Sequence, residues 1–324
     1  MLLKIFKANP LLLLVSGIAF CALLWAASFL HPNETMYSYT DVTLLSPVFE
    51  KVSNFPLIKG ILGLAVLLLI AGVWNRIVNK HSLLKQSTYF PFFFMLILLS
   101  CRPSLISFYP ALAASLFLIL FLDRMISSYK KERATSNIFD SGLFIGIATL
   151  FYIPSILFLI VLWVSIFTIR TVNGRELLGS LIGFLIPFLF AFTYHLVFSP
   201  TYHWYNKIAG QFVYHKIHFS FSWEQITIII IMLLAAAASV WFFVNKVGDN
   251  ILKTQKFWNL LIWFMLISVA SMLLSPVKDS RAFAILAIPG SFVLSAYFLR
   301  ARAKLFPELL FLSLLAAVIV SMFF

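Results

Sequence analysis

Long uninterrupted apolar runs recur along the whole chain, and the short segments between them hold most of the charged residues. The hydrocarbon core of a bilayer is about 30 Å thick, so a helix needs roughly 20 apolar residues to cross it. A membrane β-barrel would instead show alternating segments of about ten residues. The pattern therefore predicts an all-α fold, a polytopic transmembrane helical bundle that forms a single integral membrane domain over residues 1–324.

The apolar runs define about 11 spans. Pro154 separates the fifth from the sixth, which predicts either a tight hairpin or a re-entrant pair. The first run has no well-placed cleavage site, so we expect an uncleaved first span and not a signal peptide. The expected spans are about 11–30, 60–78, 88–101, 105–122, 139–153, 155–169, 177–198, 226–244, 257–274, 282–299 and 305–324.

The composition agrees with a membrane protein, because 62% of the residues are apolar and 11% are charged. The net charge of +13 does not indicate nucleic-acid binding, because the basic residues are dispersed over short loops. With the N-terminus in the cytoplasm, 17 of the 24 Lys and Arg residues fall in inner loops. The positive-inside rule then predicts an N-terminus in the cytoplasm and, with about 11 spans, a C-terminus on the outer side. Cys21 and Cys101 lie within apolar runs and suggest small buried residues.

Only two outer connections are long in this topology, His31–Leu57 and Ser199–Gln225. Two long loops on one face suggest a site there, because loops carry many binding and catalytic groups. In the first loop, Asp41 and, as a second choice, Glu34 are candidate general bases, since a carboxylate can take a proton from an acceptor hydroxyl. The alternative for each is an acid that is simply solvated.

Several cations lie in short outer turns, although the positive-inside rule places most Lys and Arg residues on the inner side. Arg102 lies in one turn, and Lys278, Asp279 and Arg281 lie in another. One interpretation is a set of interface anchors and mutual ion pairs. The other is a cationic cluster for a lipid-linked phosphate, since an arginine can hold two oxygens at once. Charges in the middle of the spans are nearly absent, which argues against a coupled transporter.

Other chemical motifs are weak. His215 and His218 would share a helix face, but aromatic neighbours favour an interfacial belt over metal binding, and we expect no metal site. Gly174 and Gly183 are isolated, and no segment resembles a Walker loop, a dinucleotide fingerprint or a zinc-protease motif.

The layout of spans and loops resembles the GT-C superfamily of membrane glycosyltransferases, which take a sugar from a polyprenyl-phosphate carrier. Pro110 to Ala148 resembles the family's fourth span, inner loop and glycine-containing fifth span. Lys278 to Pro289 resembles its late turn, where a basic residue and an arginine precede an apolar helix with an internal proline. Ala282 stands where that family usually has tyrosine. Overall, the chain most closely resembles an uncharacterised family of bacterial multi-pass membrane proteins of unknown function. The resemblance implies a bacterial inner (cytoplasmic) membrane, in which the N-terminus would be cytoplasmic and the C-terminus periplasmic.

The resemblance implies a GT-C-like membrane glycosyltransferase, active or degenerate, with its site at the periplasmic face. Asp41 or Glu34 would be catalytic, and Arg102, Lys278 and Arg281 would hold the carrier phosphate. We expect membrane lipid, a polyprenyl-phosphate sugar donor and envelope proteins as partners, and the sequence names no cofactor. The alternative is a non-catalytic scaffold or lipid-binding subunit of a larger envelope complex.

Overall fold

The computed structural model describes residues 6–7, 9–30, 55–84, 86–129, 131, 134–169, 173–198, 252–273, 280–300 and 305–323. Over these ranges all the regular structure is helical, which agrees with the predicted all-α class. The expected span at 226–244 lies outside them. The α-helices are α2 (Pro10–Leu30), α5 (Pro56–Lys80), α6 (Phe90–Leu99), α7 (Pro110–Ser127), α8 (Thr135–Phe151), α9 (Phe158–Ile169), α10 (Gly174–Phe198), α13 (Leu252–Leu273), α14 (Phe283–Arg300) and α15 (Leu305–Phe323).

Proline sets several helix boundaries. Pro56, Pro91 and Pro110 stand in the first positions of α5, α6 and α7, where a missing N–H costs no intrahelical hydrogen bond. The predicted break at Pro154 is also present, because a short 3₁₀ helix, η2 (Ile153–Leu157), separates α8 from α9.

Five helices of the described part, α5, α7, α10, α13 and α14, are long and apolar enough to cross a membrane. Five more helical segments there are apolar but shorter. These helices indicate a membrane protein. The expected ranges match the described helices closely, while the count of about 11 crossings stays a prediction.

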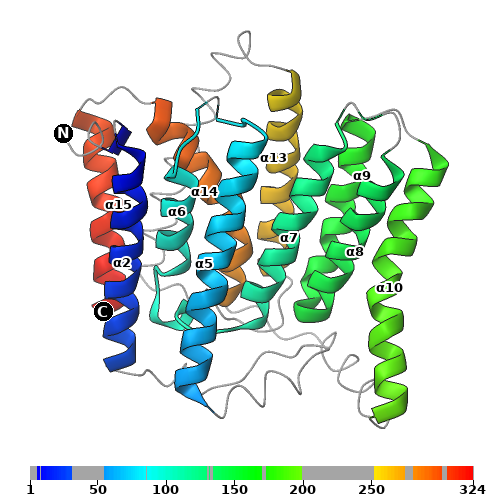
Figure 1. The fold of residues 1–324 in the computed structure, drawn as a ribbon, viewed down its shortest axis with the longest axis horizontal. Coiled ribbons are helices and arrows are strands. Elements are labelled where there is room, and N and C mark those ends of the chain that lie inside the picture. Colours follow the sequence, from blue (N-terminus) through cyan, green and yellow to red (C-terminus); the bar gives the residue numbers. More distant parts are fainter. Residues whose placement is uncertain are drawn as a thin grey trace.

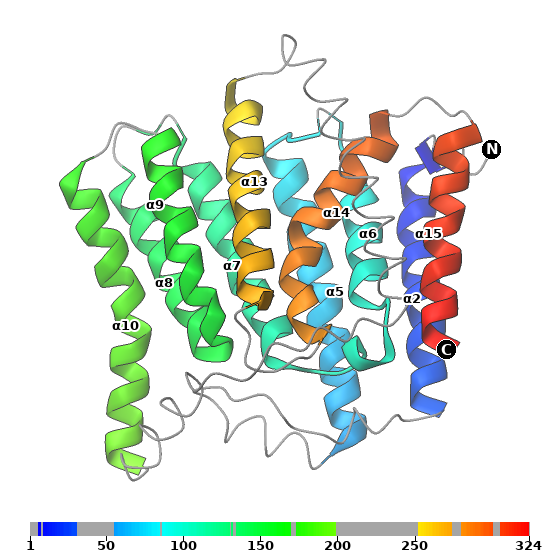
Figure 2. The ribbon, with the colours of Figure 1, turned by 180° about the vertical axis from the view of Figure 1, so that it is seen from behind.

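The helices lie side by side, with α2 and α15 at one edge and α10 at the other (Figure 1). The view from behind shows α13 and α14 on the face opposite α5 (Figure 2). Neighbours in sequence from α5 to α10 alternate in direction, so their termini gather at two opposite ends of the bundle. We call these the Lys80 end, where α5 and α7 finish, and the Arg281 end, where α5, α7 and α14 begin.

Every residue of α6 is buried. This helix packs against α14, α5 and α2, helices that come from distant parts of the sequence. Aromatic rings join α6 to α14 and α15, with centroids 5.2 Å apart for Phe94 and Phe298 and 5.8 Å apart for Phe93 and Phe311. Lipid tails are as apolar as these side chains, so close packing, more than exclusion from water, holds such helices together.

Tryptophan indoles form hydrogen bonds between helices. The Trp25 Nε1–H donates to Ser100 Oγ at 3.1 Å, and the Trp74 Nε1–H donates to Ser291 Oγ on α14 at 2.9 Å. Ser291 in turn donates to the Ile288 carbonyl oxygen at 2.8 Å, so its hydroxyl both accepts and donates. These bonds satisfy polar groups that would otherwise be costly to bury.

Glycines bring α8 and α10 into close contact. A Cβ on Gly142 would meet the Ser180 carbonyl oxygen, and one on Gly183 would meet the Phe139 carbonyl oxygen. The sequence analysis treated Gly183 as an isolated glycine. The structure shows instead that Gly183 belongs to the contact between α8 and α10. It lies four residues after Gly179, and Gly146 lies four after Gly142, so each helix carries the G-x-x-x-G spacing of closely packed membrane helices.

We predict that Gly142→Ala lowers the free energy of unfolding by about 1–3 kcal/mol, because the new methyl group collides with the backbone of α10. Gly72→Ala on α5 is the matched control, since nothing lies within 4 Å of its Cβ position. Alanine favours a helix over glycine, so the control should gain up to about 1 kcal/mol. Unfolding in mixed detergent micelles followed by circular dichroism measures both, and equal effects would contradict the close packing.

A second prediction concerns the bond between Trp74 and Ser291. A double-mutant cycle of Trp74→Phe and Ser291→Ala should give a coupling energy of about 0.6 kcal/mol, the average for hydrogen bonds between membrane helices, and at most about 1.7 kcal/mol. The same unfolding measurement provides the four stabilities. Additive effects of the two substitutions would show that the bond contributes nothing.

Candidate functional site

At the Arg281 end, two short 3₁₀ helices pack together. These are η1 (Pro103–Leu105), which directly follows Arg102, and η4 (Ser280–Ala282), which contains Arg281. The η4 helix contacts η1, α7 and α14. Arg281 is 3% exposed, and Arg102 is half-buried. Two arginines that are far apart in sequence thus lie on elements in mutual contact.

The start of α5 lies against the segment between Arg102 and Tyr109, here called the 102–109 connection. The Phe108 N–H donates to the Lys59 carbonyl oxygen at 3.1 Å. One turn later, a Cβ on Gly63 would meet the backbone of Ser107 and Phe108. The Lys59 residue is 4% exposed. The connection therefore carries one cation itself and is flanked by a buried lysine on α5 and a buried arginine on η4.

Such a group of cations suits a phosphate. Arg281 and Arg102 can each present a planar fork of N–H groups to two oxygens, and Lys59 adds a point charge. A charge held out of water interacts strongly with an ion of opposite sign, because the surroundings have a low dielectric constant. The Arg281 end is therefore a candidate anion-binding site.

Of the site residues predicted from the sequence, Arg102 directly precedes η1 and Arg281 lies on η4, and these two elements pack together. Their roles as phosphate ligands stay predictions. Asp41, Glu34 and Lys278 lie outside the described residues, so their roles stay predictions. Lys59 was missed. Two features of the sequence could have indicated it: Lys59 is one of the few cations on the outer side, and it comes just after the proline that starts an apolar run.

The acids of the described part lie at the other end. Asp123 lies near the end of α7, and the other three lie near the beginnings of helices. These three are Asp140 on α8, Glu176 on α10 and Glu308 on α15. Within the described ranges, the Arg281 end therefore has cations and no carboxylate. A base at that end would have to come from a segment such as the one that contains Asp41.

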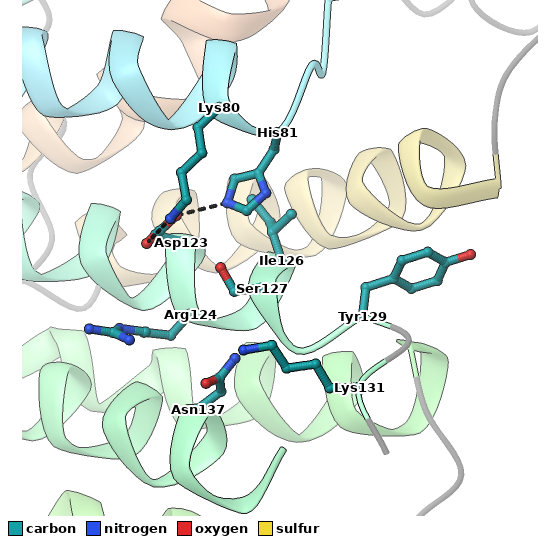
Figure 3. A pocket seen from close by; sticks show the side chains of 9 residues that line it. All are labelled: Lys80, His81, Asp123, Arg124, Ile126, Ser127, Tyr129, Lys131 and Asn137. Carbon is teal, nitrogen blue, oxygen red and sulfur yellow. Dashed lines mark hydrogen bonds and ion pairs between the residues drawn. The ribbon is translucent and has the colours of Figure 1, made fainter. Parts of the chain in front are cut away.

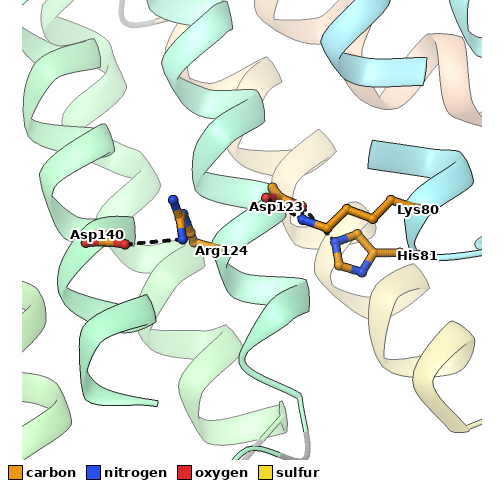
Figure 4. Close-up of polar contacts among 5 residues, drawn as sticks. All are labelled: Lys80, His81, Asp123, Arg124 and Asp140. Atoms are coloured by element: carbon orange, nitrogen blue, oxygen red, sulfur yellow. Dashed lines mark hydrogen bonds and ion pairs between the residues drawn. The ribbon is translucent and has the colours of Figure 1, made fainter. Parts of the chain in front are cut away.

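At the Lys80 end, Asp123 on α7 joins α5 to α7 through two partners. Lys80 Nζ lies 3.0 Å from Asp123 Oδ1 and 3.1 Å from Oδ2, and His81 Nε2 lies 2.8 Å from Oδ1. Figure 4 shows this cluster beside a second pair, in which Arg124 reaches Asp140 on α8 at 3.5 Å. The ion pairs connect the ends of α5, α7 and α8 at one surface.

A pocket of about 610 Å³ opens beside this cluster (Figure 3). The sequence interpretation treated its charged residues only as topology signals. The adjacent pairs Lys80-His81 and Asp123-Arg124, each at the end of an apolar run, were the available signal of a polar cluster. Its lining residues are Lys80, His81, Asp123, Arg124, Ile126, Ser127, Tyr129, Lys131 and Asn137.

Among the described residues, no group of three or more His, Cys, Asp or Glu side chains is arranged to hold a metal ion. His215 and His218 lie outside those ranges. Cys21 and Cys101 are both buried free thiols, as predicted.

Comparison with known proteins gives a family and no activity. No curated protein and no solved structure matches the chain. A family of unknown function, DUF6427, matches residues 37–324. The match covers most of the 324 residues and agrees with the expectation of an uncharacterised family. The chain belongs to the DUF6427 family.

Proposed function

We propose that the Arg281 end binds the phosphate of a lipid-linked sugar, and that the protein is a GT-C-like membrane glycosyltransferase that uses it. The observation that carries the phosphate site is the placement of Lys59, Arg102 and Arg281 around the 102–109 connection, with two of the three cations buried. The sugar-transfer step rests on the resemblance of the loop layout to GT-C enzymes.

The proposed reaction is a direct displacement at the anomeric carbon. The acceptor hydroxyl oxygen forms a bond to that carbon, and its proton passes to Asp41, or to Glu34 as the second choice. The bond from the anomeric carbon to the phosphate oxygen breaks, and its electron pair leaves on that oxygen. Arg281, Arg102 and Lys278 stabilise the departing polyprenyl phosphate, because preorganised cations act most strongly where negative charge develops.

A second candidate function is a non-catalytic lipid-binding subunit or scaffold of a larger envelope complex. The observation that favours it is that the described part of the Arg281 end supplies cations for a phosphate but no carboxylate to act as a base. Such a subunit would need the phosphate site and would not need Asp41.

We further propose that the protein lies in a bacterial inner membrane, with the Lys80 end in the cytoplasm and the Arg281 end in the periplasm. The excess of Lys and Arg in the loops assigned to the cytoplasm supports this orientation. The N-terminus is then cytoplasmic and the C-terminus periplasmic. The sugar donor would be used from the periplasmic leaflet.

The orientation is tested with single cysteines and a membrane-impermeant maleimide on intact spheroplasts. Phe55→Cys reports on the Arg281 end, because Phe55 is 59% exposed, and Arg175→Cys reports on the other end. The native cysteines are buried and serve as the unlabelled background. We expect labelling of Phe55→Cys before lysis and of Arg175→Cys only after it, and the reverse order would contradict the orientation.

The activity is tested with purified protein, a polyprenyl-phosphate-linked sugar and a range of hydroxyl acceptors. We expect Asp41→Asn to lose turnover by about 10²–10⁴-fold, as for loss of a general base, while it still binds the donor. Arg281→Ala should lose both turnover and binding. Arg102→Gln, at a more exposed position, repeats the test with less risk to folding, and Arg175→Gln is the control for loss of a positive charge.

Two results would change this assignment. Turnover that is unchanged in both Asp41→Asn and Arg281→Ala would remove the glycosyltransferase proposal. Donor binding that depends on Arg281, with no turnover in the wild type for any acceptor, would favour the lipid-binding subunit.

A further inference from the structure

The pocket at the Lys80 end has the composition of an anion site. Three cations, Lys80, Arg124 and Lys131, line it against one acid, Asp123. That acid is already held by Lys80 and His81 at 2.8–3.1 Å, so its charge is compensated within the pocket wall. Ser127 adds a hydroxyl group. Arg124 is paired with Asp140 on α8 at 3.5 Å, so among the described residues the excess positive charge of the lining comes from Lys131. An incoming anion therefore meets this excess charge together with hydrogen-bond donors.

Asn137 provides independent evidence for a ligand. Its side chain lines the pocket, the residue is only 8% exposed, and its Nδ2 atom has no hydrogen-bond acceptor. Leaving a buried donor unsatisfied costs about 1–3 kcal/mol, so such a group calls for an explanation. In Figure 3 the amide of Asn137 and the ammonium of Lys131 extend into the same part of the pocket. Two donors that line one pocket suit an oxygen that accepts from both.

The start of α8 adds to this preference. Asn137 belongs to the first turn of α8, whose N-cap residue, Ala134, is buried and makes no side-chain capping bond. The first N–H groups of a helix have no intrahelical acceptor, and the helix dipole places partial positive charge there. An anion at this position is stabilised by the helix as well as by the side chains.

We propose that this pocket is a second site, at the opposite end from Arg281, and that it binds a phosphate monoester or diester. The volume of about 610 Å³ exceeds that of a bare phosphate and suits a phosphate with an attached group. Lys131 and Asn137 contact the phosphate oxygens, and Arg124, which is paired with Asp140, adds positive charge to the pocket wall. Lys80 and His81 hold Asp123. Basic pockets between transmembrane helices commonly hold anionic lipid headgroups, and a soluble phosphate ester offers the same chemistry.

The experiment compares wild-type protein with Lys131→Gln, Asn137→Leu and Arg175→Gln. Arg175→Gln is the control, because it removes one positive charge at the same end but does not line the pocket. One arm measures phosphatidylglycerol and phosphatidylcholine retained on the detergent-purified protein by native mass spectrometry. The other arm measures glycerol 3-phosphate binding by equilibrium dialysis in a detergent free of phospholipid.

We expect Lys131→Gln to weaken binding about tenfold, as for loss of one charge-assisted hydrogen bond, and Arg175→Gln to leave it unchanged. Asn137→Leu should also weaken binding, while the ligand-free protein unfolds at the same or a higher temperature, because an unsatisfied buried amide has been removed. A response in the phosphatidylglycerol arm alone identifies a lipid headgroup. A response to glycerol 3-phosphate identifies a soluble ester.

The proposal is overturned if neither probe distinguishes Lys131→Gln from Arg175→Gln. It is also overturned if Asn137→Leu lowers the unfolding temperature and leaves binding unchanged. Asn137 would then stabilise the fold and would not contact the phosphate. Arg281→Ala should keep the binding that Lys131→Gln loses. Failure of this proposal and failure of the proposed glycosyltransferase site are therefore distinguishable.

Discussion

Hydrocarbon offers no hydrogen-bond partners, and this constraint organises the described part of the molecule. Helices satisfy their own backbone groups, and polar side chains inside the bundle must find partners there. Many of the buried serines do so locally, as when Ser141 and Ser165 donate to carbonyl oxygens four residues earlier. The indoles of Trp25 and Trp74 use serines on other helices. Few groups then remain to do chemistry within the bundle, and charged side chains collect at its two ends.

The two ends differ in their use of charge. At the Lys80 end, acids and bases alternate across three helices and form ion pairs, which fix the ends of α5, α7 and α8 relative to one another. At the Arg281 end, the described cations Lys59 and Arg281 are buried around the 102–109 connection, and the described ranges contribute no acid. A cluster that contains both acids and bases mainly stabilises the packing of the helices. It binds an anion through whatever positive charge remains unbalanced. An all-cationic group is suited to holding an anion.

The sequence predicted the helices well, because a run of apolar residues is a local property and needs no knowledge of neighbours. It also selected Arg102 and Arg281 as candidate phosphate ligands, because cations in short outer turns oppose the expected charge bias, and their roles stay predictions. It did not predict that Gly183 meets Phe139, that Lys59 lies beside Phe108, or that Asn137 closes a pocket with Lys131. Each of these depends on which helices pack together, and one sequence contains no direct record of such pairs.

The helix α7 connects the two candidate sites and sets the distance between them. It begins just after the 102–109 connection and finishes with Asp123 and Arg124 in its last turns. At 1.5 Å per residue, its 18 residues span about 27 Å, close to the thickness of the hydrocarbon core. The two groups of cations are therefore separated by about one bilayer core. A phosphate bound at one end cannot reach the other without crossing it, so the two sites would take their ligands from opposite leaflets or from opposite compartments.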